Sequence, residues 1–238
     1  MPLAAKFDTV GPLCRSVEDA SLLLALTEGS KPIDMGSTDI EGRRFAILRT
    51  VAFDDIEDAP ATAFDDAVAR LKDAGAVIED LHFDAIEEAM PLSGCLYTAE
   101  AYGLWRDVIE ANSDAMYGEI LERFRLGKSH SGPDYVAAWA KIDKIRVEYL
   151  KAVAGFDAVL IPTAPLLPPK LDRLETEHDY YVSANLMTLR NTRIGNLMGV
   201  AAVTLPTGTP SCGLMLMGTP NGEEHLLRVA AAAEEALA

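Results

Sequence analysis

The sequence predicts an α/β protein in which a mixed β-sheet is flanked by helices on both faces. A strand, a helix and a second strand follow one another over residues 44–81, which is typical of a βαβ unit with parallel strands and a right-handed crossover. Two further apolar runs, at 203–205 and 213–217, lie close enough in sequence for an antiparallel pair. With no linker or internal repeat in sight, we expect a single domain over residues 1–238.

The first third of the chain supplies the βαβ unit and a helix before it. Ser16 with Asp19 has the spacing of a capping box, and Gly29 is a typical residue after a helix end. The run RFAIL is apolar enough for a buried strand, and AVIEDL is the next strand candidate. The expected elements are, in order, a helix over 16–29, a strand over 44–48, a helix from Pro60 to Gly75 and a strand over 76–81.

The remainder is mostly helical up to residue 156 and then returns to strands. Pro91 interrupts the first helical segment, because proline cannot donate a backbone hydrogen bond. A long helix starting near Pro133 carries an aromatic stripe that we interpret as core packing. The other expected elements are a strand over 157–161, a surface excursion over 166–182, and a final helix capped by Asn221 with Glu224.

The stretch from Arg190 to Gly208 joins a polar run to an apolar one. We expect a helix end that leads into a buried strand, and α/β folds bind ligands beside the ends of such strands. The polar side chains of this stretch are therefore candidates for substrate binding; the alternative is that they cap the helix and bond the strand end. They are Asn191, Thr192, Arg193 and Asn196.

Composition limits the class of partner. The net charge of −16 repels the phosphates of nucleic acids and anionic membranes, so we expect neither as a partner. The four histidines and three cysteines lack metal-ligand spacing, and no phosphate-binding loop occurs, so we expect no metal and no cofactor. We expect each cysteine to be a small buried side chain, which fits a reducing compartment. No apolar run reaches the ~18 residues of a membrane helix, and the expected location is cytoplasmic.

Three segments in the right order resemble the amidase signature family. They are FDTVGPLCRSVEDASLLLALTEG at 7–29, DAVLIPTAP at 157–165, and NTRIGNLMGVAAVTLPTG with GLMLMGTPNGEEHLLRVAAAAEEAL at 191–237. The resemblance implies the C-terminal part of an amidase signature fold. Members hydrolyse amides with a serine nucleophile, a bridging cis-peptide serine and a lysine base. Those residues belong to a GGSSGG-type loop and a lysine-bearing strand of the family's N-terminal half, and neither pattern is present here.

The resemblance therefore implies no catalytic residue in this chain. Lys128, Ser129 and Ser131 match a helical region on the substrate side and are expected in a loop between helices. The chain would contribute substrate pocket and scaffold to an amidase acting on the C–N bond of a small-molecule amide, and would be inactive alone. Its expected partner is an N-terminal amidase half or further copies of itself. The alternative is a stand-alone, non-catalytic binding or assembly module derived from the amidase fold.

One pocket residue follows from the resemblance. In the branch that amidates transfer RNA, an arginine binds the substrate carboxylate, and Arg123 in RFRLG falls at the matching position. Its alternative role is to complement the dipole at a helix end. The acidic residue that this branch uses for the substrate amino group would fall near Leu189, where this sequence has no carboxylate. That difference favours a neutral, aromatic or carboxylated amide over an aminoacyl substrate.

Overall fold

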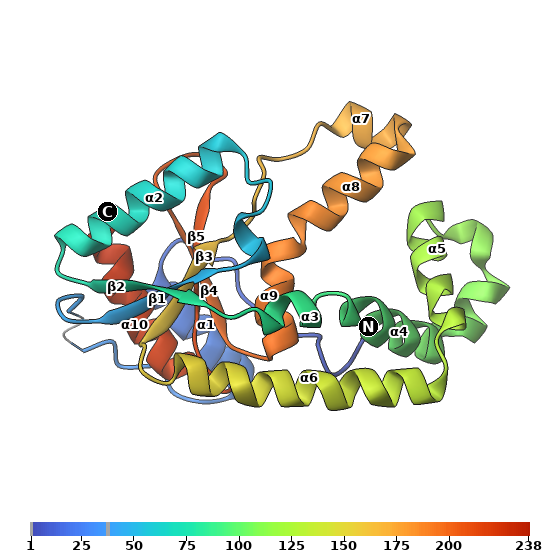
Figure 1. Ribbon diagram of the computed structural model, residues 1–238, viewed down its shortest axis with the longest axis horizontal. Helices are drawn as coiled ribbons and strands as arrows, with labels where there is room; N and C mark the ends of the chain where they lie inside the picture. Colours follow the sequence, from blue (N-terminus) through green and yellow to red (C-terminus); the bar gives the residue numbers. More distant parts are fainter. Residues whose placement is uncertain (1, 37–38) are drawn as a thin grey trace.

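The computed structural model describes residues 2–36 and 39–238, which form a five-stranded mixed sheet with helices packed on both faces (Figure 1). The strand order is β2-β1-β3-β5-β4. β1 runs parallel to β2 and β3, whereas β5 is antiparallel to both β3 and β4. The strands are β1 (Arg44–Arg49), β2 (Val77–His82), β3 (Ala158–Pro162), β4 (Ala202–Pro206) and β5 (Gly213–Met217). The predicted mixed sheet, its parallel βαβ pair and its antiparallel pair are confirmed.

The centre of the sheet is buried because its strands are apolar on both sides. Residues 45–48 of β1 are all buried, and so is every residue of β3. Strands covered on both faces have continuous apolar sequences rather than alternating ones, as RFAIL and AVLI do. These two strands therefore hold the two helical layers together.

One face of the sheet is covered by α2 (Asp58–Asp73) and α10 (Glu223–Ala236), with α1 (Val17–Glu28) packed on α10. The Ser16 hydroxyl accepts a hydrogen bond from the Asp19 backbone N–H at 3.1 Å, and Gly29 ends α1 in the left-handed conformation at φ 69°. The predicted end at Gly29 is confirmed, and of the predicted capping box the bond accepted by Ser16 is present. The core of this layer includes Phe45, Phe64, Leu71, Leu216, Leu226 and Val229.

The other face is covered by α3 (Ala85–Ala89), α4 (Leu92–Ala111), α6 (Gly132–Val153) and α9 (Arg190–Met198). α6 begins with a full capping box between Ser131 and Asp134. Its aromatic stripe packs into the core as predicted, with Tyr149 fully buried and Trp139 stacked on Phe7 at 4.9 Å between ring centroids. Pro91 separates α3 from α4, as expected.

The remaining helices lie outside the two layers. α5 (Gly118–Arg125) follows α4, while α7 (Leu171–Thr176) and α8 (His178–Thr188) project from the sheet toward the same end of the molecule (Figure 1). Short 3-10 turns occur at η1 (Val51–Phe53), η2 (Ser113–Ala115) and η3 (Leu126–Ser129). Within residues 2–36 and 39–238, none of the helices has both the length and the apolar character required to cross a bilayer.

The surface excursion over 166–182 is confirmed: most of its residues are exposed, and it contains α7 and the start of α8. Three local expectations are corrected. The strand after α9 is only partly buried: β4 lies at a sheet edge, and Ala202, Thr204 and Pro206 are exposed, whereas Leu205 is buried. Gly222, not Asn221, is the N-cap of α10, and a glycine has no side chain to accept a capping bond. Asn221 precedes the cap in a left-handed turn conformation at φ 55°. Of the three cysteines expected to be buried, Cys212 is buried, whereas Cys95 is half-buried and Cys14 is exposed.

Candidate substrate-binding site

Arg123, one of the predicted site residues, lies in the last turn of α5 and points to α8. Its Nη1 donates a hydrogen bond to Oδ1 of Asn185 at 2.6 Å, and both residues are partly buried. The position at a helix C-terminus also lets the guanidinium interact with the helix dipole. The neutral side-chain amide of Asn185 accepts from only one of the five N–H groups of Arg123. It does not compensate the positive charge of the guanidinium.

Arg193, on α9, is half-buried beside Arg123. Burial lowers the pKa of the Arg193 guanidinium; Tyr97 raises that pKa, and the positive charge of Arg123 lowers it. An arginine stays protonated under such shifts, so two positive charges lie near enough to repel each other. Across the described residues, the Arg193 side chain forms no hydrogen bond or ion pair, and Arg123 bonds only Asn185. The arrangement suits an anionic group with planar oxygens, such as a carboxylate.

Asn196 joins this region to the chain's first residues. Tyr97, on α4, donates its hydroxyl to Oδ1 of Asn196 at 2.7 Å, and Nδ2 of Asn196 donates to the Phe7 carbonyl at 2.8 Å. Burial raises the pKa of Tyr97 to about 12, so the phenol remains a neutral donor at physiological pH. Phe7 packs edge-on against Tyr97 with ring centroids 4.6 Å apart. Asn196 thus orients Tyr97 next to Arg193.

The other two predicted residues of α9 point elsewhere. Asn191 is fully buried, and its Nδ2 donates to the carbonyls of Ala52 at 3.0 Å and Pro162 at 2.7 Å. It therefore connects α9 to η1 and to the end of β3. Thr192 is exposed and donates its hydroxyl to the Leu189 carbonyl within the same helix region at 3.3 Å. The structure brings Arg123, Arg193 and Asn196 together but places Asn191 and Thr192 outside this group.

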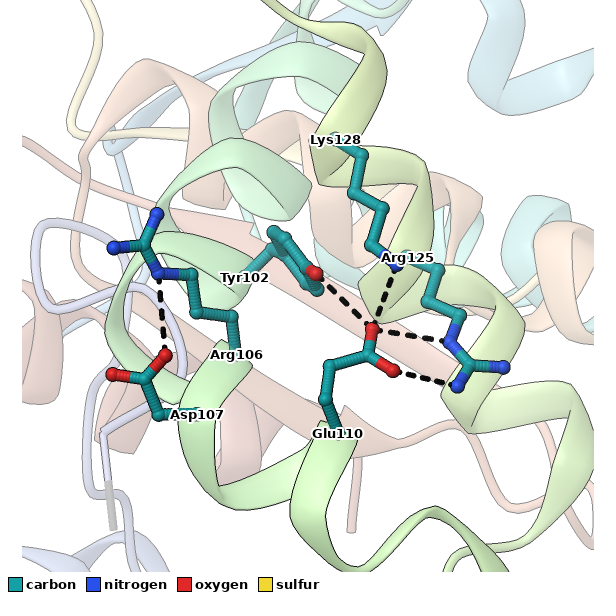
Figure 2. A network of polar contacts seen from close by, with 6 residues as sticks. All are labelled: Tyr102, Arg106, Asp107, Glu110, Arg125 and Lys128. Carbon is teal, nitrogen blue, oxygen red and sulfur yellow. Dashed lines mark hydrogen bonds and ion pairs between the residues drawn. The ribbon is translucent and has the colours of Figure 1, made fainter.

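The segment that carries Arg123 is held against α4 by a charged network (Figure 2). Oε1 of Glu110 accepts from Tyr102, Arg125 and Lys128 at 3.0, 3.2 and 2.8 Å, and Oε2 accepts from Arg125 at 2.7 Å. The hydrogen bond from Arg125, followed by that from Lys128, lowers the pKa of Glu110 to about 2. Gly127 adds a close approach, because a Cβ there would overlap the Thr98 carbonyl and lie 2.6 Å from Cβ of Tyr102.

The lysine and serines near this segment have local roles. Lys128 pairs with Glu110, and Ser129 donates to the Leu126 carbonyl at 2.8 Å. Ser131 caps α6 and donates to Oδ2 of Asp134 at 2.6 Å. In residues 2–36 and 39–238 there is also no group of three His, Cys, Asp or Glu side chains able to hold a metal ion.

Two residues of the site were missed by sequence reasoning. Tyr97 lies in the second turn of α4 and Asn185 on α8, each far in sequence from its partner. No motif or spacing marks either position, because only the packing of α4, α5, α8 and α9 brings them to the two arginines. Asn185 can be identified only from the folded structure, because its partner Arg123 is 62 positions away in the sequence.

Comparison with known proteins shows which family this sequence resembles. The family model described as Amidase matches residues 1–227. Among curated relatives, the 2-amino-5-chloromuconic acid deaminase of Comamonas testosteroni is 29% identical over 97% of this chain and 51% of its own length. An amidase of Pseudomonas putida is 26% identical over 98% of this chain and 54% of its own length. The chain thus spans about half the length of the curated relatives it matches.

Solved structures share the fold. A crystal structure of an amidase superposes with a TM-score of 0.82 at 22% identity, covering 99% of this chain and 54% of the other. An allophanate hydrolase of Kluyveromyces lactis gives a TM-score of 0.70 at 24% identity, covering 92% of this chain and 38% of the other. With the family model matching nearly all of its sequence, the chain belongs to the amidase family.

Proposed function

We propose that this chain forms the substrate-binding part and scaffold of an amidase that hydrolyses the C–N bond of a small-molecule amide. The serines and lysine that perform the chemistry would come from polypeptide outside it, since this sequence contains no GGSSGG-type loop. The proposal is supported by family membership and by the relatives, of which about half lies outside the matched region.

The observation that carries the proposal is the pair Arg123 and Arg193. Placing a half-buried guanidinium beside a second one costs free energy unless an anion joins them. A substrate with a carboxylate would occupy that position and accept bidentate hydrogen bonds, while Tyr97 and Asn196 border it. The C. testosteroni relative is named as a deaminase of an acid, which agrees with a carboxylated substrate. We therefore favour a carboxylated amide over a neutral one.

The test is ammonia release from matched amides that do or do not carry a carboxylate. The chain is assayed alone and joined to the part of the C. testosteroni relative that it does not match; we call this second form the joined protein. We expect no release by the chain alone and a preference for carboxylated amides in the joined protein. Turnover by the chain alone would overturn the assignment of the chemistry to another segment.

Arginine variants of the joined protein test the pocket. One charged hydrogen bond contributes about 1.5–3 kcal/mol, so Arg193→Ala or Arg123→Ala should lower kcat/KM for carboxylated amides by about 10- to 150-fold and leave neutral amides nearly unchanged. The matched control is Arg173→Ala, whose guanidinium pairs with Glu177 on the surface. Equal losses for both amide classes would refute carboxylate recognition. Carboxylate binding without any turnover in the joined protein would favour the non-catalytic binding module instead.

A further inference from the structure

The start of α8 is attached to the start of α5 by two side-chain contacts. Nδ1 of His178 lies 2.6 Å from Oε1 of Glu119, and the rings of Tyr181 and Tyr117 meet edge-on with centroids 5.7 Å apart. His178 and Tyr181 belong to the first turn of α8, and Glu119 belongs to the first turn of α5. These contacts fix the start of α8 against α5, and they determine where the rest of α8 lies.

Asn185 lies two turns further along α8 and is the residue by which this helix meets Arg123. Its Oδ1 accepts a hydrogen bond from Nη1 of Arg123 at 2.6 Å, and across residues 2–36 and 39–238 neither side chain has another hydrogen-bond or ion-pair partner. Because Oδ1 is the acceptor, the two N–H groups on Nδ2 remain available to donate. A single neutral acceptor thus orients a charged guanidinium.

The neutral acceptor preserves the charge of Arg123. A carboxylate in the same place would accept two parallel hydrogen bonds from the guanidinium and neutralise it. Two neighbouring acids are engaged by other side chains: Glu110 pairs with Arg125 at 2.7 Å, and Glu119, one turn before Arg123, contacts His178. In the part of the chain that the structure describes, no carboxylate therefore pairs with Arg123.

We propose that Asn185 is a specificity-determining residue, which positions Arg123 for an anionic group of the substrate and, being neutral, leaves the guanidinium charge to that anion. The inference rests on the proposed function, in which Arg123 and Arg193 bind a carboxylate. The substrate oxygens accept from the N–H groups of Arg123 that Asn185 does not use, and Nδ2 of Asn185 is a further donor for the same anion. A carboxylate at position 185 would compete with the substrate for these N–H groups.

Two substitutions of nearly equal size separate this role from a structural one. Asn185→Asp places a carboxylate beside Arg123, which strengthens the contact between α5 and α8 but cancels a positive charge of the site. Asn185→Leu removes the acceptor and weakens the contact but leaves the charges of both arginines. A purely structural role predicts that Asn185→Leu is the more harmful change, whereas the proposed role predicts that Asn185→Asp is.

Binding to the chain alone is measured by NMR titration with succinamate, which carries a carboxylate, and with succinamide, its neutral analogue. We expect the unsubstituted chain to bind succinamate more tightly than succinamide. Asn185→Asp should weaken succinamate binding at least about tenfold, as for the loss of one charge-assisted hydrogen bond, and Asn185→Leu should weaken it only about two- to fivefold. Neither change should alter the binding of succinamide.

A matched control and a kinetic readout complete the experiment. Asn221→Asp adds the same charge at an exposed residue before α10, which covers the opposite face of the sheet, and should leave succinamate binding unchanged. In the joined protein, the effect of Asn185→Asp should appear in KM for carboxylated amides, with kcat nearly unchanged, because the substitution weakens substrate binding and not the chemical step.

Three results would overturn the proposal. Asn185→Asp could bind succinamate as tightly as the unsubstituted chain, Asn185→Leu could lose more than Asn185→Asp, or the unsubstituted chain could bind succinamate no better than succinamide. The binding readout does not depend on turnover. Loss of succinamate selectivity in Asn185→Asp without amide hydrolysis by the joined protein would refute only the proposed function. Hydrolysis with a carboxylate preference that Asn185→Asp leaves intact would refute only the role of Asn185.

Discussion

Replacing Asn191 with alanine should destabilise the fold rather than weaken substrate binding. The substitution removes the 2.7 Å hydrogen bond to the Pro162 carbonyl, and a buried acceptor left without its partner costs about 1–3 kcal/mol. The Ala52 carbonyl loses its 3.0 Å bond from Asn191 but keeps one from Nη2 of Arg190 at 3.2 Å. Its contribution to the loss of unfolding free energy is therefore smaller. Together with the small cavity, we expect a loss of about 2–3 kcal/mol.

Urea unfolding followed by circular dichroism measures this loss. With a slope of about 2–3 kcal/mol per molar urea, the midpoint should fall by about 1 M at unchanged slope. Thr192→Ala is the control, since Thr192 is the exposed neighbour whose single side-chain bond stays within its own helix region, and its effect should stay within about 0.5 kcal/mol. Equal midpoints for the two variants would show that Asn191 does not connect α9 to the sheet.

Three further results are expected. Gly127→Ala should lower the free energy of unfolding by about 1–3 kcal/mol in the same urea assay, because its Cβ would overlap a backbone carbonyl of α4; Gly103→Ala, with open space around it, should not, and equal effects would contradict the close approach. The hydrogen bond that the protonated His178 ring donates to Glu119 raises the pKa of His178, so this contact stabilises the fold fully below the unfolded pKa of about 6.5 and is lost as pH rises through the higher folded pKa. An NMR titration should show that Glu119→Gln lowers the pKa of His178, and an unchanged titration would refute the contact. Ellman's reagent should modify the exposed Cys14 rapidly, the half-buried Cys95 more slowly and the buried Cys212 only after unfolding; fast modification of Cys212 would contradict its burial.

The fold was predictable where apolar pattern and turn residues agree. RFAIL and DAVLI predict strands through their apolar residues, which at 45–48 and 158–161 are buried, and Gly29 ends α1 because a glycine adopts the left-handed conformation without strain. β4 was misjudged because its sequence, AVTLP, is as apolar as a central strand. Whether a strand is buried depends on its position in the sheet, and the sequence of β4 does not show that it lies at an edge.

The site was predictable only in part, for a similar reason. RNTRIGN marks α9 as polar, but helical periodicity sends its side chains in different directions, so Asn191 enters the core while Arg193 turns to Tyr97 and Arg123. Asn185 and Tyr97 have no pattern of their own and reach the site through the packing of separate helices. Local sequence therefore indicated the helix, and tertiary packing selected the residues.

The contact between Phe7 and Asn196 has a consequence for the time course of synthesis. These residues are 189 positions apart, and Phe7 also needs Trp139 and Tyr97 for its packing. At a ribosomal rate of about 5–20 residues per second, the Phe7 ring waits about 10–40 s before α9 has emerged. Throughout that interval the segment around Phe7 displays an aromatic side chain to water and to chaperones. Slowing translation ahead of α9 should lengthen this exposure, and speeding it should shorten it.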